Sequence, residues 1–349
     1  MKKFILLLPF ALVFACTPKE ETVTPTADYK TEITNLANEV ILPTYADLYA
    51  KTDVLVQKVA VLRQNQTPAN LEAARQAWRD ARMPWERSEG FLFGPVDQQG
   101  IDPSIDSWPV NKSDLDAVLA SSNTLNRAYI DGLEGTLKGF HTIEYLLFGI
   151  NANKQLNDFT QRQFEYLVGC TASLHGATEQ LYFAWKPDKQ NFIKNILTAG
   201  EAGNTFYPSQ KAALQEIVNG IVAIADEVAN GKIQDPFSQS NLTLEESYFS
   251  ANSKADFADN IRSIKNAYLG TYNNATGLGL SSVVSAKNKT LDAKVKVECD
   301  AAIAAIENIT GTFSWAVMNA RPSVENAQNK VRTLQQTLQA EVLPIVSNL

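Results

Sequence analysis

The sequence predicts an all-α protein made of two antiparallel helical-bundle domains. Apolar residues recur at steps of three and four along most of the 349 residues, which is the period of one helix face. No long stretch alternates apolar and polar residues between turn signals, as a half-buried strand would. The length fits about two domains at ~150 residues each. We therefore expect an N-terminal helical domain over 29–190 and a C-terminal helical domain over 200–349.

The first residues predict an export signal that is not part of the fold. Lys2 and Lys3 precede an apolar run, 4–14, about half as long as the ~20 residues of a membrane-spanning helix. The run ends in Val13-Phe14-Ala15-Cys16, which resembles the cleavage site of bacterial lipoproteins, with valine where leucine is usual. We expect 1–28 to hold the signal peptide, this lipobox and a polar tether, with the lipid attached to Cys16. The alternative is ordinary secretion, in which Cys16 is discarded with the signal.

A lipid on Cys16 would attach the protein to a bacterial membrane outside the cytoplasm. The segment Lys19-Glu20-Glu21 resembles surface-export signals of some lipoproteins, which favours the outer membrane and its surface. That compartment permits a disulfide between Cys170 and Cys299, although two buried free thiols fit equally. The net charge of −7 at pH 7 and the absence of a basic stripe argue against a nucleic-acid partner.

The N-terminal domain opens with a helical pattern of apolar residues from Ile33 to Leu62. Thr67-Pro68 then predicts an N-cap followed by proline at the first helical position. A stripe from Leu71 to Ala81 continues that helix, and Pro84 predicts its end or a kink near Met83. Farther on, Ser113 with Asp116 resembles a capping box, and 164–185 reads as a long helix.

One segment of this domain, 90–111, breaks the helical pattern. It holds three glycines and three prolines and is far longer than the usual loop of ~4–6 residues. Long irregular segments in compact domains are often functional, so the carboxylates of Asp102 and Asp106 are candidate site groups. The alternative is a surface loop in which these residues only form turns.

The C-terminal domain follows a segment, 186–209, that is interrupted by prolines and glycines. Apolar residues from Leu214 to Val228 predict the next helix, with Gly231 as its C-terminal cap. Further helical patterns run over 253–268, 291–309 and 323–346. The pentapeptide Glu39-Val40-Ile41-Leu42-Pro43 resembles Glu341-Val342-Leu343-Pro344, and this short repeat hints at an internal duplication.

The strongest candidate functional residues are His141 and Glu144. Residues three apart share a helix face, so the imidazole and the carboxylate can reach one point. The chain has two histidines in all, and histidine is the commonest metal ligand. An ionisable pair on an apolar helix costs free energy unless something compensates it. We interpret the pair as part of a metal or catalytic site; the alternative is a core histidine with Glu144 at the surface.

Glu86 and Glu89 repeat the same spacing. Two adjacent carboxylates repel unless a cation lies between them, although a solvated face paired with Arg82 or Arg87 would also explain them. His175 lies on an apolar stripe, which indicates a hydrogen-bonded core histidine. Because the chain has no His-Glu-x-x-His motif, a metal site here must be rich in carboxylates. Such a site favours iron, manganese or calcium over zinc.

The segment Gly139-Phe140-His141-Thr142-Ile143-Glu144 resembles the Gly-x-His-x-x-Glu hallmark of the imelysin family. The similarity extends to 85–96, 102–109 and 260–270. It implies a two-domain helical protein outside the cytoplasm, with a conserved site near the junction of the domains. On this resemblance the candidate site residues are His141 and Glu144 in the hallmark, Glu86 and Glu89 in its acidic partner segment, and, with less support, Asp106 and Arg262.

The resemblance implies two competing functions. In a binding protein, these residues hold a divalent or trivalent cation, iron first, for uptake or regulation beside iron-transport components. In a metallopeptidase, the class in which the family is placed, the same ion activates water and Glu144 is the candidate general base. The missing second histidine favours binding.

Overall fold

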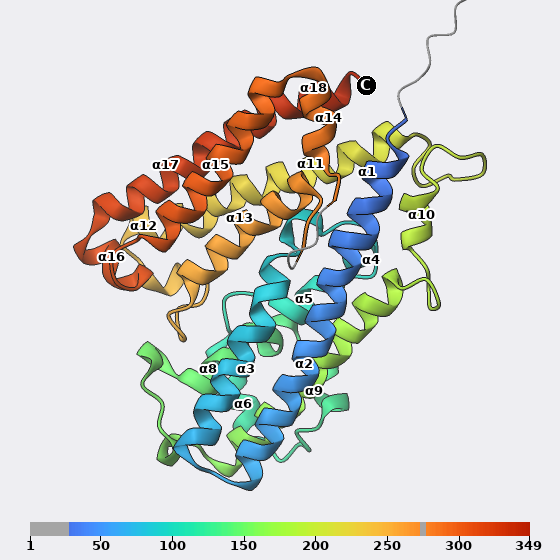
Figure 1. The fold of residues 1–349 in the computed structure, drawn as a ribbon. Coiled ribbons are helices and arrows are strands. Elements are labelled where there is room, and N and C mark those ends of the chain that lie inside the picture. Colours follow the sequence, from blue (N-terminus) through green and yellow to red (C-terminus); the bar gives the residue numbers. More distant parts are fainter. Residues whose placement is uncertain (1–27, 273–276) are drawn as a thin grey trace, which may run out of the picture.

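A computed structural model describes residues 28–272 and 277–349, and these residues form helices and connecting segments without any strand (Figure 1). The predicted all-α fold is confirmed. The predicted signal peptide, the lipobox with Cys16 and nearly all of the tether lie outside the described residues. Among the described helices, each is too short or too polar to cross a bilayer.

Three long helices, α2, α3 and α9, make up most of the first half of the chain, and α2 packs against both α3 and α9 (Figure 1, blue to green). Shorter elements connect them and carry the segment that the sequence marks as irregular. The elements are α1 (Lys30–Asn35), η1 (Leu36–Ile41), α2 (Leu42–Gln64), α3 (Pro68–Glu86), η2 (Glu89–Phe91), α4 (Pro95–Gln98), α5 (Asp102–Asp106), α6 (Lys112–Ala120), α7 (Arg127–Asp131), η3 (Gly135–Leu137), α8 (Gly139–Phe148), η4 (Ile150–Ala152), η5 (Leu156–Asp158) and α9 (Gln161–Trp185).

Helices of the second half form another layered group, in which α13 packs on α11 and α15, and α15 packs on α17 (Figure 1, yellow to red). The elements are α11 (Gln210–Glu227), η6 (Val228–Lys232), α12 (Gln234–Gln239), η7 (Leu242–Leu244), α13 (Ser253–Leu269), α14 (Leu280–Lys287), α15 (Lys289–Glu307), α16 (Phe313–Asn319), α17 (Arg321–Thr337), η8 (Leu338–Val342) and α18 (Leu343–Ser347). The short helix α10 (Ile193–Leu197) lies between the two groups in sequence and packs on α1 and η1.

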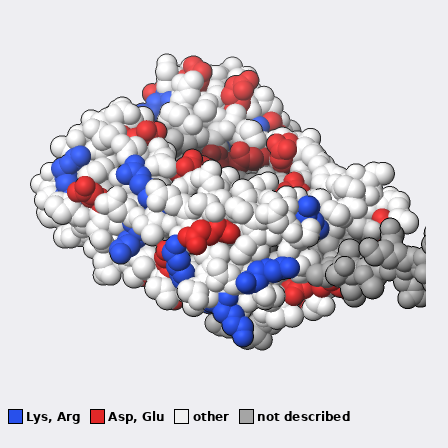
Figure 2. All heavy atoms as spheres, turned by 90° about the horizontal axis from the view of Figure 1, so that it is seen from above, with Lys and Arg blue, Asp and Glu red and all other residues white. Residues whose placement is uncertain are grey.

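The two groups of helices meet where α3 packs on α13 and η2 packs on α11. Buried apolar side chains form one continuous cluster that runs from Ile33 to Val346 and joins the groups. The domain limits 29–190 and 200–349 therefore stay a prediction, because the groups share a core. The face seen in Figure 2 carries scattered basic side chains and several acidic ones along a hollow, in keeping with the predicted lack of a basic stripe.

Helix boundaries in the first half can be compared with their sequence signals. The Thr67 hydroxyl caps α3 as predicted, accepting a hydrogen bond from the Asn70 amide at 3.2 Å. For the end or kink predicted near Met83, the structure shows a helix that includes Pro84 and ends at Glu86. Proline interrupts only one hydrogen bond in the ladder, and the helix ends a few residues later. The capping box at Ser113 is wrong, because Asn111 is the N-cap of α6 and accepts from the Asp114 amide at 3.2 Å.

Gly231 does not cap α11 as predicted. The chain continues from α11 into η6, a π-helical segment that contains Gly231, so the wider turn replaces a left-handed cap. Two other π-helical segments, η1 and η8, contain or overlap the repeated Glu-Val motif, and each leads into a Leu-Pro pair. The repeat thus shares one local form, while the duplication stays a prediction.

Cys170 and Cys299 are free and buried, so of the two alternatives the free thiols hold. Burial raises the pKa of each thiol to about 12. Both thiols are therefore protonated and inert near neutral pH. His175 is half-buried, its ring stacks on Tyr49 with centroids 4.9 Å apart, and its Nδ1 lies 3.1 Å from the Thr52 hydroxyl. This agrees with the prediction of a hydrogen-bonded histidine.

Candidate metal-binding site

A buried charge cluster lies where the two groups of helices meet. Each of its side chains is no more than 10% exposed, so water screens their charges poorly. The first half of the chain supplies five members and the segment after α11 supplies two. The members of the buried charge cluster are Arg82, Glu86, Glu89, Asp106, His141, Lys232 and Glu246.

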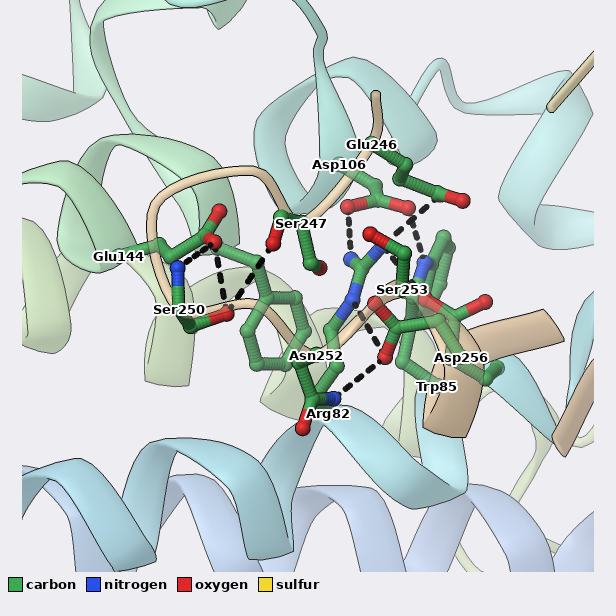
Figure 3. Close-up of polar contacts among 12 residues, drawn as sticks. Arg82, Trp85, Asp106, Glu144, Glu246, Ser247, Ser250, Asn252, Ser253 and Asp256 are labelled. Atoms are coloured by element: carbon green, nitrogen blue, oxygen red, sulfur yellow. Dashed lines mark hydrogen bonds and ion pairs between the residues drawn. The ribbon is translucent and has the colours of Figure 1, made fainter. Parts of the chain in front are cut away.

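Arg82 is the centre of the cluster and is fully buried. Figure 3 shows its guanidinium reaching toward Asp106 and Glu246. Its Nη2 lies 2.9 Å from Glu246 Oε1 and 2.5 Å from Glu86 Oε1, and its Nη1 forms an ion pair with Asp106. Burial opposes the charged guanidinium, but these carboxylates outweigh it and hold the Arg82 pKa well above its ordinary value. Arg82 thus joins an acid from each half of the chain.

Gly139 explains how His141 reaches this cluster. α8 begins at Gly139 with φ +76°, a backbone conformation that favours glycine. A Cβ at this position would lie 2.4 Å from the carbonyl oxygen of Ile105, so only glycine lets α8 approach α5 this closely. The approach brings His141 Nε2 to 3.1 Å from Asp106 Oδ1. Trp85 Nε1 donates to the other Asp106 oxygen at 2.6 Å.

Glu144 binds the second nitrogen of the imidazole. Its Oε2 lies 3.2 Å from His141 Nδ1. Its Oε1 accepts hydrogen bonds from the backbone amide and the hydroxyl of Ser250, both at 2.7 Å, as Figure 3 shows. Glu144 therefore ties α8 to the segment before α13. Burial lowers the His141 pKa, but Asp106 outweighs burial and raises it to about 9. The imidazole is cationic at neutral pH in this arrangement.

Lys232 supplies a third cation to the cluster. Its Nζ lies 2.8 Å from Glu89 Oε2 and 2.9 Å from Glu246 Oε1. Burial opposes the ammonium, yet these carboxylates keep the Lys232 pKa well above its ordinary value. Burial raises the Glu89 pKa to about 8 even though Lys232 acts against it. Burial likewise raises the pKa of Glu86 well above its usual range, so the acids are only partly compensated.

Two overlapping sets of side chains could hold a metal ion, judged over the described residues. In each set the ligand atoms lie within 4.8 Å of one another. The first set joins His141 with Asp106 and Glu246, and the second contains Glu86, Glu89, Asp106 and Glu246. Glu246 Oε2 is buried without a hydrogen-bond partner, and the 3.1 Å contact of the buried His141 Nε2 with Asp106 Oδ1 lacks hydrogen-bond geometry; both situations are rare for buried polar atoms. One imidazole nitrogen among carboxylates is a donor set that suits iron or manganese.

A cleft of about 460 Å³ leads to these groups. Glu89, Asp106, Lys232 and Glu246 lie on its wall, and Trp108 lies beside them. Trp108 also packs on His141, with ring centroids 4.8 Å apart. The irregular segment predicted over 90–111 forms short helices and supplies Asp106 and Trp108, so its interpretation as a site segment has a structural basis.

The structure brings most of the predicted site residues together. His141, Glu86, Glu89 and Asp106 are members of the buried charge cluster, and Glu144 adjoins it through His141. The alternative explanation places Glu86 on a solvent-exposed face, paired with Arg82. The ion pair with Arg82 is present, but the face is not exposed, because both side chains are fully buried.

Arg262 is the predicted residue that lies apart from the cluster. Its ion pairs go to Asp259 and Glu307, and it lines a separate cleft. Sequence reasoning missed Lys232 and Glu246. The one signal for Glu246 is the Glu245-Glu246 pair in a polar stretch, and Lys232 follows a glycine that reads as a helix cap.

The fold and the site define a class: an all-helical protein with a buried, carboxylate-rich charge cluster between two helical groups. Comparisons with known proteins identify the family. The model of the imelysin family matches residues 41–342. The chain is 30% identical over 318 residues to the iron-regulated protein A of Synechococcus elongatus, covering 90% of this chain and 86% of that protein. The chain therefore belongs to the imelysin family.

Solved structures agree with this assignment. A crystal structure of a candidate iron-regulated protein A precursor from Parabacteroides distasonis superimposes with a TM-score of 0.83 at 28% identity, covering 94% of this chain and 98% of that one. An imelysin-like protein from Psychrobacter arcticum gives a TM-score of 0.71 at 13% identity, covering 91% and 95%, which shows the shared fold alone.

Proposed function

We propose that this protein binds a metal ion, iron in the first place, at the buried charge cluster and serves iron uptake or its regulation. The observation that carries the proposal is the buried His141 Nε2 atom, which lies 3.1 Å from Asp106 Oδ1 as an ion pair without hydrogen-bond geometry and shares one candidate ligand set with Asp106 and Glu246. Two relatives are named for iron regulation, which supports iron over manganese, the other ion that suits this donor set. The donor set of His141, Asp106 and Glu246 fits such an ion.

His141, Asp106 and Glu246 are the proposed ligands, with Glu86 and Glu89 close by. Glu144 has a different role in this proposal, because its oxygens already bind His141 Nδ1 and Ser250. A carboxylate on the far nitrogen of a ligating histidine fixes the ring and its tautomer. We propose that Glu144 orients the imidazole so that Nε2 points at the ion.

Charge balance also supports a bound cation. Around the cluster, six carboxyl groups face three cations, namely Arg82, Lys232 and the protonated imidazole of His141; the six are Glu86, Glu89, Asp106, Glu144, Glu246 and Asp256. Burial raises the pKa of Asp256 to about 7, so part of the excess negative charge is removed by protonation in the metal-free protein. A bound cation would compensate it directly.

A metallopeptidase is the second candidate function, because the family is classed with peptidases. It needs an open ligand position and a base within ~3 Å of the attacking water. Glu144 is the base that the sequence suggests, yet both of its oxygens are engaged. This engagement weighs against Glu144 as a base and favours binding.

His141→Ala tests the proposal, with His175→Ala as the matched control. Titration calorimetry with ferrous ion under anaerobic conditions, or with Mn²⁺, should show binding in the wild type and in His175→Ala. Binding should be lost in His141→Ala while circular dichroism shows unchanged helix content. Unchanged affinity in His141→Ala would refute the ligand assignment. Chelator-sensitive cleavage of unfolded substrates by the wild type would favour the peptidase instead.

A further inference from the structure

Lys232 lies inside the second of the two candidate ligand sets. Its Nζ is 2.8 Å from Glu89 Oε2, 2.9 Å from Glu246 Oε1 and 3.7 Å from Glu86 Oε2. These three carboxylates and Asp106 are the members of that set. The ammonium therefore takes the position among the carboxylates that a cation bound to this set would need.

The backbone at this point is specialised. Lys232 ends the π-helical segment η6, which follows α11 directly. A π-helical turn holds more residues than an α-helical one, so it changes the direction of the side chains that follow, and such turns are frequent at functional sites. Here the turn brings a lysine that is 9% exposed onto the cleft wall beside Glu89 and Glu246.

The two ligand sets differ in how their carboxylates are already compensated. Arg82 contacts Glu86, Asp106 and Glu246, and it would stay in place beside an ion at His141. Glu89 has Lys232 as its only cationic partner among the described residues, together with an amide hydrogen from Asn260 at 3.1 Å. Loss of the lysine charge would thus leave Glu89 and one side of Glu246 open toward the cleft.

We infer that Lys232 is a built-in competitor of the metal ion: its ammonium fills the Glu86–Glu89–Glu246 side of the cluster and limits the protein to one ion, at His141. The inference rests on the proposed function for the first ion and adds a second, blocked position. A lysine that substitutes for a cation in this way also keeps the metal-free protein folded, because buried carboxylates without a counter-ion repel one another.

Lys232→Met removes the charge and keeps a similar length. Lys232→Arg retains the charge, and Lys265→Met is the matched control, since Lys265 pairs with Asp300 outside the cluster. Equilibrium dialysis with Mn²⁺ should give one ion per chain for the wild type, Lys232→Arg and Lys265→Met, and two for Lys232→Met. The melting temperature of Lys232→Met should be below that of the wild type in EDTA and should rise further than that of the wild type on addition of Mn²⁺.

The outcomes separate this inference from the proposed function. One ion in the wild type and one ion of unchanged affinity in Lys232→Met overturns the role of Lys232 and leaves the proposed function standing. No ion in the wild type but one in Lys232→Met supports the blocked position and overturns the site at His141. A Lys232→Met protein that is unfolded in EDTA and stays unfolded with Mn²⁺ overturns the inference, because the metal then does not substitute for the ammonium.

Discussion

Gly139→Ala is the substitution that tests most directly how the backbone builds the site. Gly139 has φ +76°, and a Cβ there would lie 2.4 Å from the carbonyl oxygen of Ile105. Both obstacles are in the backbone, so rotation of a side chain cannot relieve them. Because Ile105 precedes Asp106, any movement that makes room separates His141 from Asp106. The substitution should therefore lower both stability and metal affinity.

The expected size follows from the two obstacles. A left-handed backbone conformation costs an alanine about 1–2 kcal/mol relative to glycine, and overpacking of a well-packed site costs about 1–3 kcal/mol. Together they predict a loss of about 2–5 kcal/mol in the free energy of unfolding. Loss of an outer-shell partner of a ligating histidine typically lowers metal affinity about 10–100-fold, and we expect a loss of at least this size here, because the substitution separates two proposed ligands, His141 and Asp106.

Urea denaturation, followed by circular dichroism, measures the change in stability. Gly100→Ala is the matched control, because Gly100 has φ +60° and no described heavy atom within 4 Å of its added Cβ. It should cost only the conformational part, about 1 kcal/mol, without change in affinity for Mn²⁺. Equal losses in the two variants would refute the argument that the contact with Ile105 requires glycine.

Two further predictions concern pH and membrane attachment. In EDTA, the free energy of unfolding should fall as pH rises from about 5 to 9. The reason is that folding raises the pKa of Glu89 from 4.5 to about 8 and that of His141 from 6.5 to about 9, so the folded state favours their protonated forms. Urea midpoints that stay constant or rise over this pH range would contradict the prediction. Cys16→Ser should release the protein from membranes if Cys16 carries a lipid, and detergent fractionation that still finds the variant in the membrane would argue against lipidation.

The sequence alone predicts the fold class and much of the site, for physical reasons that particular residues make clear. Helical periodicity in Leu71 to Ala81 and the cap at Thr67 are local signals, and α3 begins where they indicate. The His141–Glu144 spacing is also local, and it places both groups on one face of α8. Such features need no knowledge of what packs against the helix.

The remaining parts of the site depend on contacts between distant segments. Glu246 approaches Arg82 across 164 positions of the chain, and no periodic pattern marks such a contact. Lys232 escaped notice because Gly231 reads as a helix end, whereas the chain continues in a π-helical turn. α3 extends two residues beyond Pro84 because a single lost hydrogen bond does not outweigh the packing of Trp85 and Glu86 in the core.

The contacts between Arg82 and Glu246 and between Glu144 and Ser250 bear on how the proposed metal ion would be released. Each contact spans the boundary between the early and late helices, so separating the two groups of helices breaks one ion pair of Arg82 and the hydrogen bonds from Ser250 to Glu144. If the protein holds an ion as proposed, release of that ion and separation of the two groups of helices are linked equilibria. On that proposal, a molecule that binds one side of the boundary would lower the affinity for the ion without contacting it.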